Sequence, residues 1–217
     1  MRSLFLTLLT CLFLLPTYAQ FQVGVTAGLN ISKFTVSDDQ FKDYVNKVNP
    51  GLIVGPTVIY NLPKTRFGFD VSALYDLRSA KSKSYDDFKS VRCHSFQFPV
   101  NLRYNFIFED MDTAYGFLFT GPQFGWTTGN NDQLIASGKG KTTGHALERR
   151  WVNQSSTFSW NFGVGAVVFN KLQVKISYNL ALRKTGDIQQ VDLTAGTSKV
   201  LTSGKAHACQ VSLSYLF

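Results

Sequence analysis

Apolar and polar residues alternate one by one along most of the chain, which is the pattern of a β-strand with two different faces. Between Phe21 and Ser32 every odd position is apolar and every even position is polar or small. A strand of this length, tilted by about 45°, rises roughly 28 Å, enough to cross the apolar core of a bilayer. The first segment therefore has both the pattern and the length of a membrane-spanning strand.

The same alternation returns in seven further segments. They span residues 52–62, 67–78, 96–106, 115–122, 158–168, 172–183 and 207–217. The fifth segment begins with an apolar set, Tyr115, Phe117 and Phe119, and loses its phase at Gly121-Pro122, where we expect a bulge or kink. An even number of strands suits closure of an antiparallel barrel. The pattern predicts an all-β fold, an eight-stranded antiparallel transmembrane barrel of the outer membrane with long extracellular loops.

The connections between the segments alternate in length. Three are short (63–65, 107–113 and 170–171), and four are long and polar (33–50, 79–93, 127–156 and 184–204). Outer-membrane barrels have short turns on the periplasmic rim and long loops on the outer rim, so we expect both termini to be periplasmic. Whether the last two strands extend as an extracellular hairpin around Ala195-Gly196 stays open. An interfacial ring of aromatic residues is expected at the short-turn rim: Phe21, Tyr60, Phe67, Tyr104, Phe106, Tyr115, Tyr215 and Phe217.

Residues 1–19 have the layout of a secretory signal peptide, which leaves 20–217 as the barrel domain. Arg2 supplies the positive start, Leu4 to Leu15 form the apolar run, and small residues precede the expected cleavage after Ala19. Beyond this segment no apolar stretch approaches the roughly 20 residues of a membrane-spanning helix. The mean hydropathy of -0.03 does not discriminate, because lipid-facing and lumen-facing residues of a barrel average out.

A soluble barrel of the lipocalin kind is the structural alternative, since alternation alone does not say which face points inward. Such a barrel would hide its apolar face around a ligand and expose charged residues. Here the apolar face is large and aromatic, and the opposite face is rich in Gly, Ser, Asn and Thr. Small polar residues suit a crowded barrel interior and make a poor solvent-facing coat, which favours the membrane barrel.

A net charge of +8 is compatible with nucleic-acid binding. The export signal and the scattered distribution of the positive charges argue against a nucleic-acid partner. Only Cys93 and Cys209 remain after residue 19, and neither belongs to a Cys-x-x-Cys or a Cys/His cluster. We therefore expect no metal, no cofactor and no disulfide scaffold.

Charged residues are nevertheless predicted on the lumen face: Asp70, Asp76, Arg103, Lys175 and Arg183. If the third and fourth strands pair with matching inward faces, Asp70 can lie opposite Arg103. An eight-stranded barrel is just wide enough for side chains to fill it. We interpret these charges as a structural ionic network that plugs a monomeric barrel, rather than as a proton or ion path.

Two other kinds of chemistry need consideration. A lipid-modifying enzyme would need a nucleophile and a base near the outer rim. The candidates are His94-Ser95, His145 and His207. Because adjacent residues of a strand point to opposite faces, His94 cannot act as the base for Ser95. The basic, flexible composition of residues 129–150 is equally consistent with a recognition loop and with a solvated loop that has no partner.

Three strand segments have the features of a known family: Gln22–Asn30, Phe96–Tyr104 with its proline, and Tyr115–Pro122 with its Gly-Pro step. They resemble the opening strand, the middle strand and the following strand of the PorT-like outer-membrane β-barrel family of the Bacteroidota. Tyr215 to Phe217 resembles the aromatic C-terminal signal that the barrel-assembly machinery reads. The resemblance covers essentially the whole mature chain. It implies an outer-membrane barrel, with no catalytic residue to carry over, and some members of the family take part in protein secretion.

The sequence thus predicts a non-enzymatic outer-membrane barrel with a structural or accessory role, in protein secretion if it follows the PorT-like members. A surface-exposed binding or adhesion module is the second hypothesis, and a lipid-modifying outer-membrane enzyme is the third. The expected partners are outer-membrane lipid, the barrel-assembly machinery during biogenesis, and an envelope or secretion-complex protein.

Overall fold

The computed structural model describes residues 21–36, 49–80, 91–107, 113–128, 132–139 and 146–217, and the expected signal peptide lies outside them. Its strands are β1 (Phe21–Val36), β2 (Asn49–Asn61), β3 (Phe67–Ser72), β4 (Leu74–Ala80), β5 (Val91–Ile107), β6 (Ala114–Thr128), β7 (Asp132–Lys139), β8 (Ala146–Asn153), β9 (Ser156–Val168), β10 (Leu172–Ala181), β11 (Gly186–Asp192) and β12 (Thr197–Leu216). Among these residues no helix is long and apolar enough to span a membrane.

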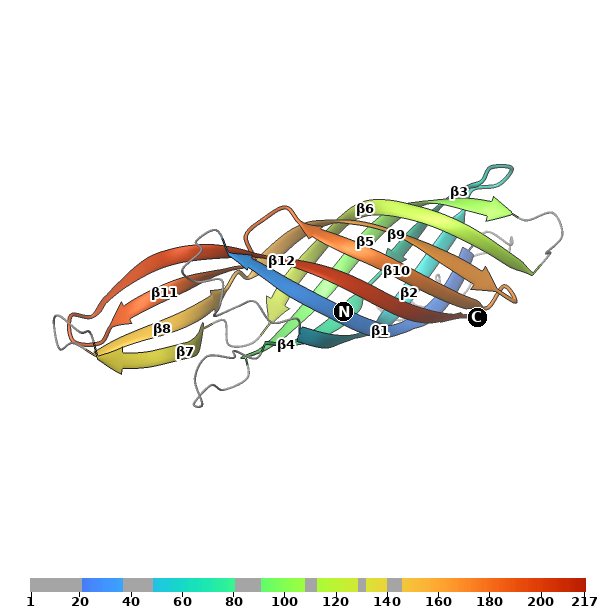
Figure 1. The fold of residues 1–217 in the computed structure, drawn as a ribbon. Coiled ribbons are helices and arrows are strands. Elements are labelled where there is room, and N and C mark those ends of the chain that lie inside the picture. Colours follow the sequence, from blue (N-terminus) through green and yellow to red (C-terminus); the bar gives the residue numbers. More distant parts are fainter. Residues whose placement is uncertain (1–20, 37–48, 81–90, 108–112, 129–131, 140–145) are drawn as a thin grey trace, which may run out of the picture.

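Eight strand positions close into an antiparallel barrel, as the alternation predicted. Around the ring the order is β1, β2, the position shared by β3 and β4, then β5, β6, β9, β10 and β12. β12 pairs back onto β1 and so completes the ring (Figure 1). The short connections 62–66 and 169–171 lie at one end, where β5 also ends and β6 begins, and we call this end the turn rim. The opposite end, from which the projecting sheet extends, is called the sheet rim.

One barrel position is divided between two strands. β3 ends at Ser72 and β4 begins at Leu74, and both pair with β2 on one side and β5 on the other. The break lies opposite Pro56, which has no N–H to continue the ladder, and Ala73 N instead donates to Pro56 O at 3.0 Å. The continuous strand predicted for 67–78 is therefore interrupted at its centre.

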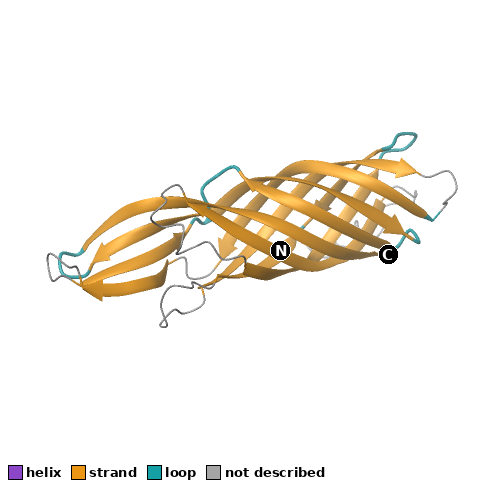
Figure 2. Ribbon diagram, viewed as in Figure 1, coloured by secondary structure: helices purple, strands orange, loops and turns teal. Residues whose placement is uncertain are grey.

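Beyond the barrel, a four-stranded antiparallel sheet projects from the sheet rim, at the left of Figures 1 and 2. It contains β7, β8, β11 and the first part of β12 in the order β12-β11-β8-β7. The hairpin left open by the sequence is present, and Gly196, at φ 66°, occupies its turn in the left-handed region that favours glycine. Residues 129–150, interpreted as a loop, instead contribute β7 and most of β8.

The barrel is inverted relative to a soluble protein. Its outward faces carry large exposed side chains, such as Leu52 (57% exposed), Phe21 (55%) and Leu213 (52%). Among the described residues 24 buried side chains are polar or charged and only 11 are hydrophobic, so the lumen is mainly polar. This arrangement is that of a barrel with lipid outside, and it excludes the lipocalin-like alternative.

In the first half of β6, the expectation that the apolar set of Tyr115, Phe117 and Phe119 faces lipid is wrong. Phe117 and Phe119 point into the barrel, where they are 2% and 4% exposed, and Leu118 faces outward. The register with β5 is the same on both sides of Gly121-Pro122, so the expected bulge is absent and the alternation continues through it. The rings fit because Gly163 and Gly165 of β9 have no side chains; a Cβ on Gly165 would lie 2.3 Å from Phe117 Cζ.

Aromatic side chains gather near the turn rim on the outward face, as predicted. The ring centroids of Phe21 and Tyr60 lie 4.5 Å apart, and those of Tyr215 and Phe217 lie 5.6 Å apart. A further cluster joins Phe67, Tyr104 and Phe106. Tyr115 is the exception, because it packs against the buried cluster of Phe117 and Phe119 rather than belonging to the exterior ring.

Candidate functional site

The lumen nearest the turn rim is filled around Arg103, which is fully buried. Its guanidinium donates to Asn105 Oδ1 at 2.9 Å and to Gln173 Oε1 at 3.0 Å. The same group lies over the Phe117 ring, with Cζ 3.9 Å from the ring centroid, a cation–π contact. Arg103 thus joins β5, β6 and β10 across the barrel and blocks its centre.

The next layer holds an ion pair between opposite sides of the barrel. Lys175 Nζ of β10 lies 2.9 Å from Asp70 Oδ2 of β3, and the side chains are 9% and 0% exposed. The hydroxyls of Thr57 and Ser72 each donate to Asp70 at 3.4 Å. The prediction that Asp70 can lie opposite Arg103 is wrong: the residue opposite Asp70 on β5 is Asn101, and Arg103 lies opposite Gly68.

A third layer surrounds Asp76 of β4. Its carboxylate accepts from Asn30 Nδ2 at 3.0 Å and from Gln97 Nε2 at 2.5 Å, and Gln97 in turn accepts from Gln123. All four side chains are buried. Asp70, Asp76, Arg103 and Lys175 therefore all point into the lumen, and together these residues form a stacked polar plug.

Arg183 is not part of this plug. β10 ends at Ala181, and Arg183 lies beyond it as an exposed residue whose backbone N donates to Phe158 O at 3.2 Å. The alternation of β10 was extended too far in the sequence, because nothing in the pattern marks where the strand stops pairing. Arg183 belongs to the surface at the sheet rim.

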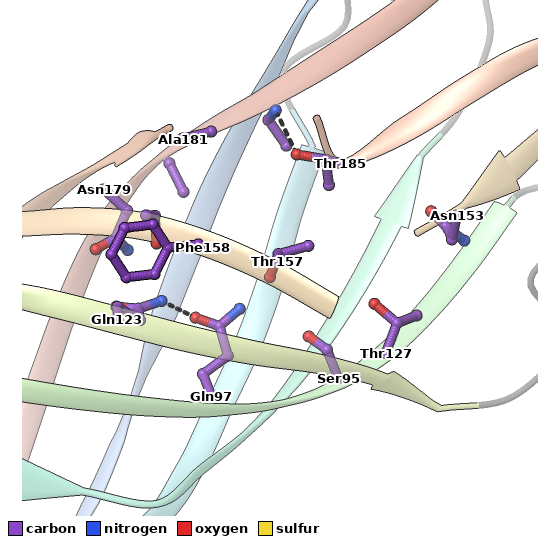
Figure 3. Close-up of a pocket in the computed structure, with 13 residues that line it drawn as sticks. Ser95, Gln97, Gln123, Thr127, Asn153, Thr157, Phe158, Asn179, Ala181 and Thr185 are labelled. Atoms are coloured by element: carbon purple, nitrogen blue, oxygen red, sulfur yellow. Dashed lines mark hydrogen bonds between the residues drawn. The ribbon is translucent and has the colours of Figure 1, made fainter. Parts of the chain in front are cut away.

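Above the plug, toward the sheet rim, lies a small pocket inside the barrel (Figure 3). Its lining consists of hydroxyl, amide and alanine side chains with one ring, Phe158, and the described lining residues include no charged group. Asn179 is buried there, and neither atom of its amide has a partner among the described residues. Buried polar groups of this kind are normally satisfied by water. We therefore expect water to occupy this pocket above the plug.

The candidate catalytic residues that the structure describes, Ser95, His94 and His207, do not come together. Ser95 is buried inside the barrel, whereas His94 lies on the outward face and shares a hydrogen bond of 2.5 Å with Tyr75 Oη. His207 also lies on the outward side, stacked on Tyr178 with centroids 6.2 Å apart. The opposite facing predicted for His94 and Ser95 is present, and His145 lies outside the described residues.

The described part of the chain holds no group of three or more metal-ligating side chains. Cys209 is free and exposed on the outward face, and the side chain of Cys93 lies outside the described residues. Tyr215 and Phe217, predicted to carry the assembly signal, are exposed at the turn rim. Their recognition by the assembly machinery stays a prediction.

Residues 17–186 match the family described as outer membrane protein beta-barrel domain. The chain belongs to this family. The match covers seven of the eight strand positions of the barrel and two of the four strands of the projecting sheet, β7 and β8. It is to the general barrel domain rather than to PorT-like proteins in particular. The sequence has no significant match among curated proteins.

Several solved structures are similar to this barrel-domain protein. They include the N-terminal β-barrel domain of Pseudomonas aeruginosa OprF, with 11% identity, TM-score 0.34, and 88% of this chain and 97% of that chain covered. Ail, the attachment invasion locus protein of Yersinia pestis, has 10% identity, TM-score 0.43, and coverages of 91% and 99%. A major outer membrane protein from Thermus thermophilus has 9% identity, TM-score 0.43, and coverages of 90% and 99%. Identities and scores this low transfer no function.

Proposed function

We propose that this protein is a non-enzymatic, non-conducting barrel that anchors a recognition sheet at the cell surface, with the sheet rim outward and both termini periplasmic. The single observation that carries the proposal is the continuity of β12. Residues 204–216 of this strand pair with β1 in the barrel, and residues 197–204 pair with β11 in the projecting sheet. One continuous strand therefore joins the sheet to its membrane anchor.

The surface of the sheet suits water rather than lipid. Ser198 and Lys199 are exposed, and Arg150 and Glu148 of β8 form an ion pair with nitrogen and oxygen 2.7 Å apart. Eight residues of β12 extend the sheet by roughly 25 Å along the strand, beyond the lipid-facing band. A polar surface held beyond the lipid-facing band supports a role in protein recognition.

The plug argues against transport. Arg103, the Lys175–Asp70 ion pair and the bonds around Asp76 occupy successive layers of the lumen. The separation of Ser95 from His94 by the barrel wall likewise argues against a hydrolytic site. The barrel thus has the features of an anchor, and its working surface is the sheet.

The partner that we propose is an envelope or secretion-complex protein, the role suggested by the resemblance to PorT-like barrels. The test compares three strains: wild type, a gene deletion, and a variant that lacks the sheet because residues 130–152 and 187–203 are each replaced by a short Gly-Ser turn. We expect the sheetless barrel to fold and to migrate faster unheated than heated, while its secreted proteome matches that of the deletion strain.

If the deletion strain keeps a normal secreted proteome and an intact envelope, the secretion role is wrong. If the sheetless variant behaves as wild type while the deletion does not, the barrel itself carries the function and the recognition role of the sheet is refuted. A surface adhesion module, the second hypothesis, would instead show loss of binding to cells or glycans with secretion unchanged.

A further inference from the structure

Four exposed basic residues lie on one sector of the sheet rim. Lys33 is near the end of β1, Lys205 lies on β12 where the barrel passes into the sheet, and Arg183 and Lys184 lie between β10 and β11. We call these four residues the rim cluster. The segments that carry them are far apart in sequence, so only the closed barrel brings them together.

The strand register fixes their proximity. Lys33 of β1 lies directly opposite His207 of β12, and Thr35 lies opposite Lys205, so Lys33 and Lys205 are diagonal neighbours about 7–8 Å apart. The other two are held against the same part of β12 by their flanking residues. Ala181 N donates to His207 Nδ1 at 3.3 Å, and Ala206 N donates to Thr185 Oγ1 at 3.0 Å.

The positive charge of the rim cluster is not compensated by the described residues. No described carboxylate forms an ion pair with Lys33, Arg183, Lys184 or Lys205. Asp187 is the acidic residue nearest in the strand register; its Oδ2 accepts from Gln154 Nε2 at 3.0 Å, and its Oδ1 is buried with no partner among the described residues. This single negative charge leaves the four positive charges in excess. Like charges on neighbouring strands repel, so an anion seated among them would be stabilising.

The cluster also stands at one edge of the lipid-facing band. Ile31, one outward position before Lys33, is 44% exposed, and Leu182, directly before Arg183, is 46% exposed. Tyr178 and His207 stack at this border: Tyr178 is level with Ile31 through Cys209, and His207 is level with Lys33. Amphipathic rings commonly lie at such a membrane interface. The basic groups are thus at the level of lipid headgroups, above side chains that contact acyl chains.

We propose that the rim cluster binds the phosphate groups of an anionic membrane lipid, with the acyl chains against the apolar faces of β1, β12 and β10. Phosphate oxygens accept strong charge-assisted hydrogen bonds from guanidinium and ammonium groups. His207 Nδ1 accepts a hydrogen bond from Ala181, so the ring carries its proton on Nε2 and has one further donor to offer. This inference rests on the barrel and its family, and it does not require the proposed partner of the sheet.

The test uses the full mature chain in lipid nanodiscs that contain either a bis-phosphorylated lipid A or the same lipid with both phosphates removed. Bound glycolipid is counted by native mass spectrometry. One variant replaces Lys33, Arg183, Lys184 and Lys205 with Gln. The control variant removes the same charge from four exposed residues elsewhere, by replacing Lys64, Arg66, Lys171 and Lys199 with Gln.

A basic residue near an anionic membrane surface contributes roughly fivefold in affinity. We therefore expect wild type and control to bind the phosphorylated lipid at least about 25-fold more tightly than the dephosphorylated lipid, which is the product of about fivefold from each of two residues of the rim cluster. The rim-cluster variant should lose this preference and keep its heat-dependent gel shift. Equal binding of both lipids by wild type overturns the proposal without any variant, as does an equal loss in both variants. Both leaflets of a nanodisc offer the lipid, so the result is independent of orientation and of the proposed function.

Discussion

Removing one partner of the Lys175–Asp70 ion pair is expected to destabilise the barrel strongly. The two charges lie 2.9 Å apart, which at an effective dielectric constant of 20 corresponds to an attraction of about 6 kcal/mol. Lys175→Met would leave the buried Asp70 carboxylate with two hydroxyl donors, each at 3.4 Å. Breaking a buried pair in this way typically costs about 3–5 kcal/mol.

The double variant Asp70→Asn with Lys175→Met should recover most of that loss, because neither charge is then buried alone. Stability is measured for the wild type, both single variants and the double variant by unfolding with guanidinium in phospholipid bilayers. Unfolding is followed by gel shift and by the fluorescence of the outward-facing Trp126 and Trp160. Lys171→Met, the same change at an exposed position, is the control and should leave the midpoint unchanged. Single variants that each cost under about 1 kcal/mol and add without coupling would mean that water fills the lumen, which would refute the plug.

Two further substitutions test the packing and the position of the membrane. Gly165→Val should lower the free energy of unfolding by about 1–3 kcal/mol or more, because its side chain would overlap the Phe117 ring. Phe117→Ala in the same chain should restore part of the loss. Ala166→Val on the outward face is the control in the same unfolding assay. Val211→Arg on the lipid-facing band should lower the free energy of unfolding by about 2–4 kcal/mol if the residue lies near the midplane of the bilayer. Val200→Arg on the projecting sheet should cause no measurable change in stability. Equal effects at the two sites would place the sheet in lipid.

The period-two alternation was sufficient to predict the barrel, because lipid outside and a polar lumen impose opposite residue types on successive positions. It failed at β6, where Phe117 and Leu118 are both apolar and alternation therefore carries no direction. The deciding signal lies in another strand: Gly163 and Gly165 of β9 leave the space that the rings of Phe117 and Phe119 fill. Only the strand order reveals that β6 and β9 are neighbours.

The lumen charges show a similar limit. Their inward facing follows from alternation, but Asp70 and Lys175 belong to β3 and β10, which are not adjacent in the barrel. Their contact crosses the lumen, so pairing of neighbouring strands suggested Arg103 as the partner instead. The projecting sheet was missed in residues 129–150 because its strands have no lipid-facing face, and β8 is a strand through its pairing with β11 rather than through its own pattern.

The proposed projection of the sheet from the outer surface of the cell can be measured directly. We would place single cysteines at Ala195, in the hairpin turn, and at Asn170, in a turn at the opposite rim, in a chain whose own cysteines are replaced by serine. Intact cells are treated with a membrane-impermeant maleimide. If the sheet rim faces outward, the cysteine at position 195 is labelled in intact cells and the cysteine at position 170 only after the outer membrane is permeabilised. Labelling at 170 but not at 195 in intact cells would show the opposite orientation.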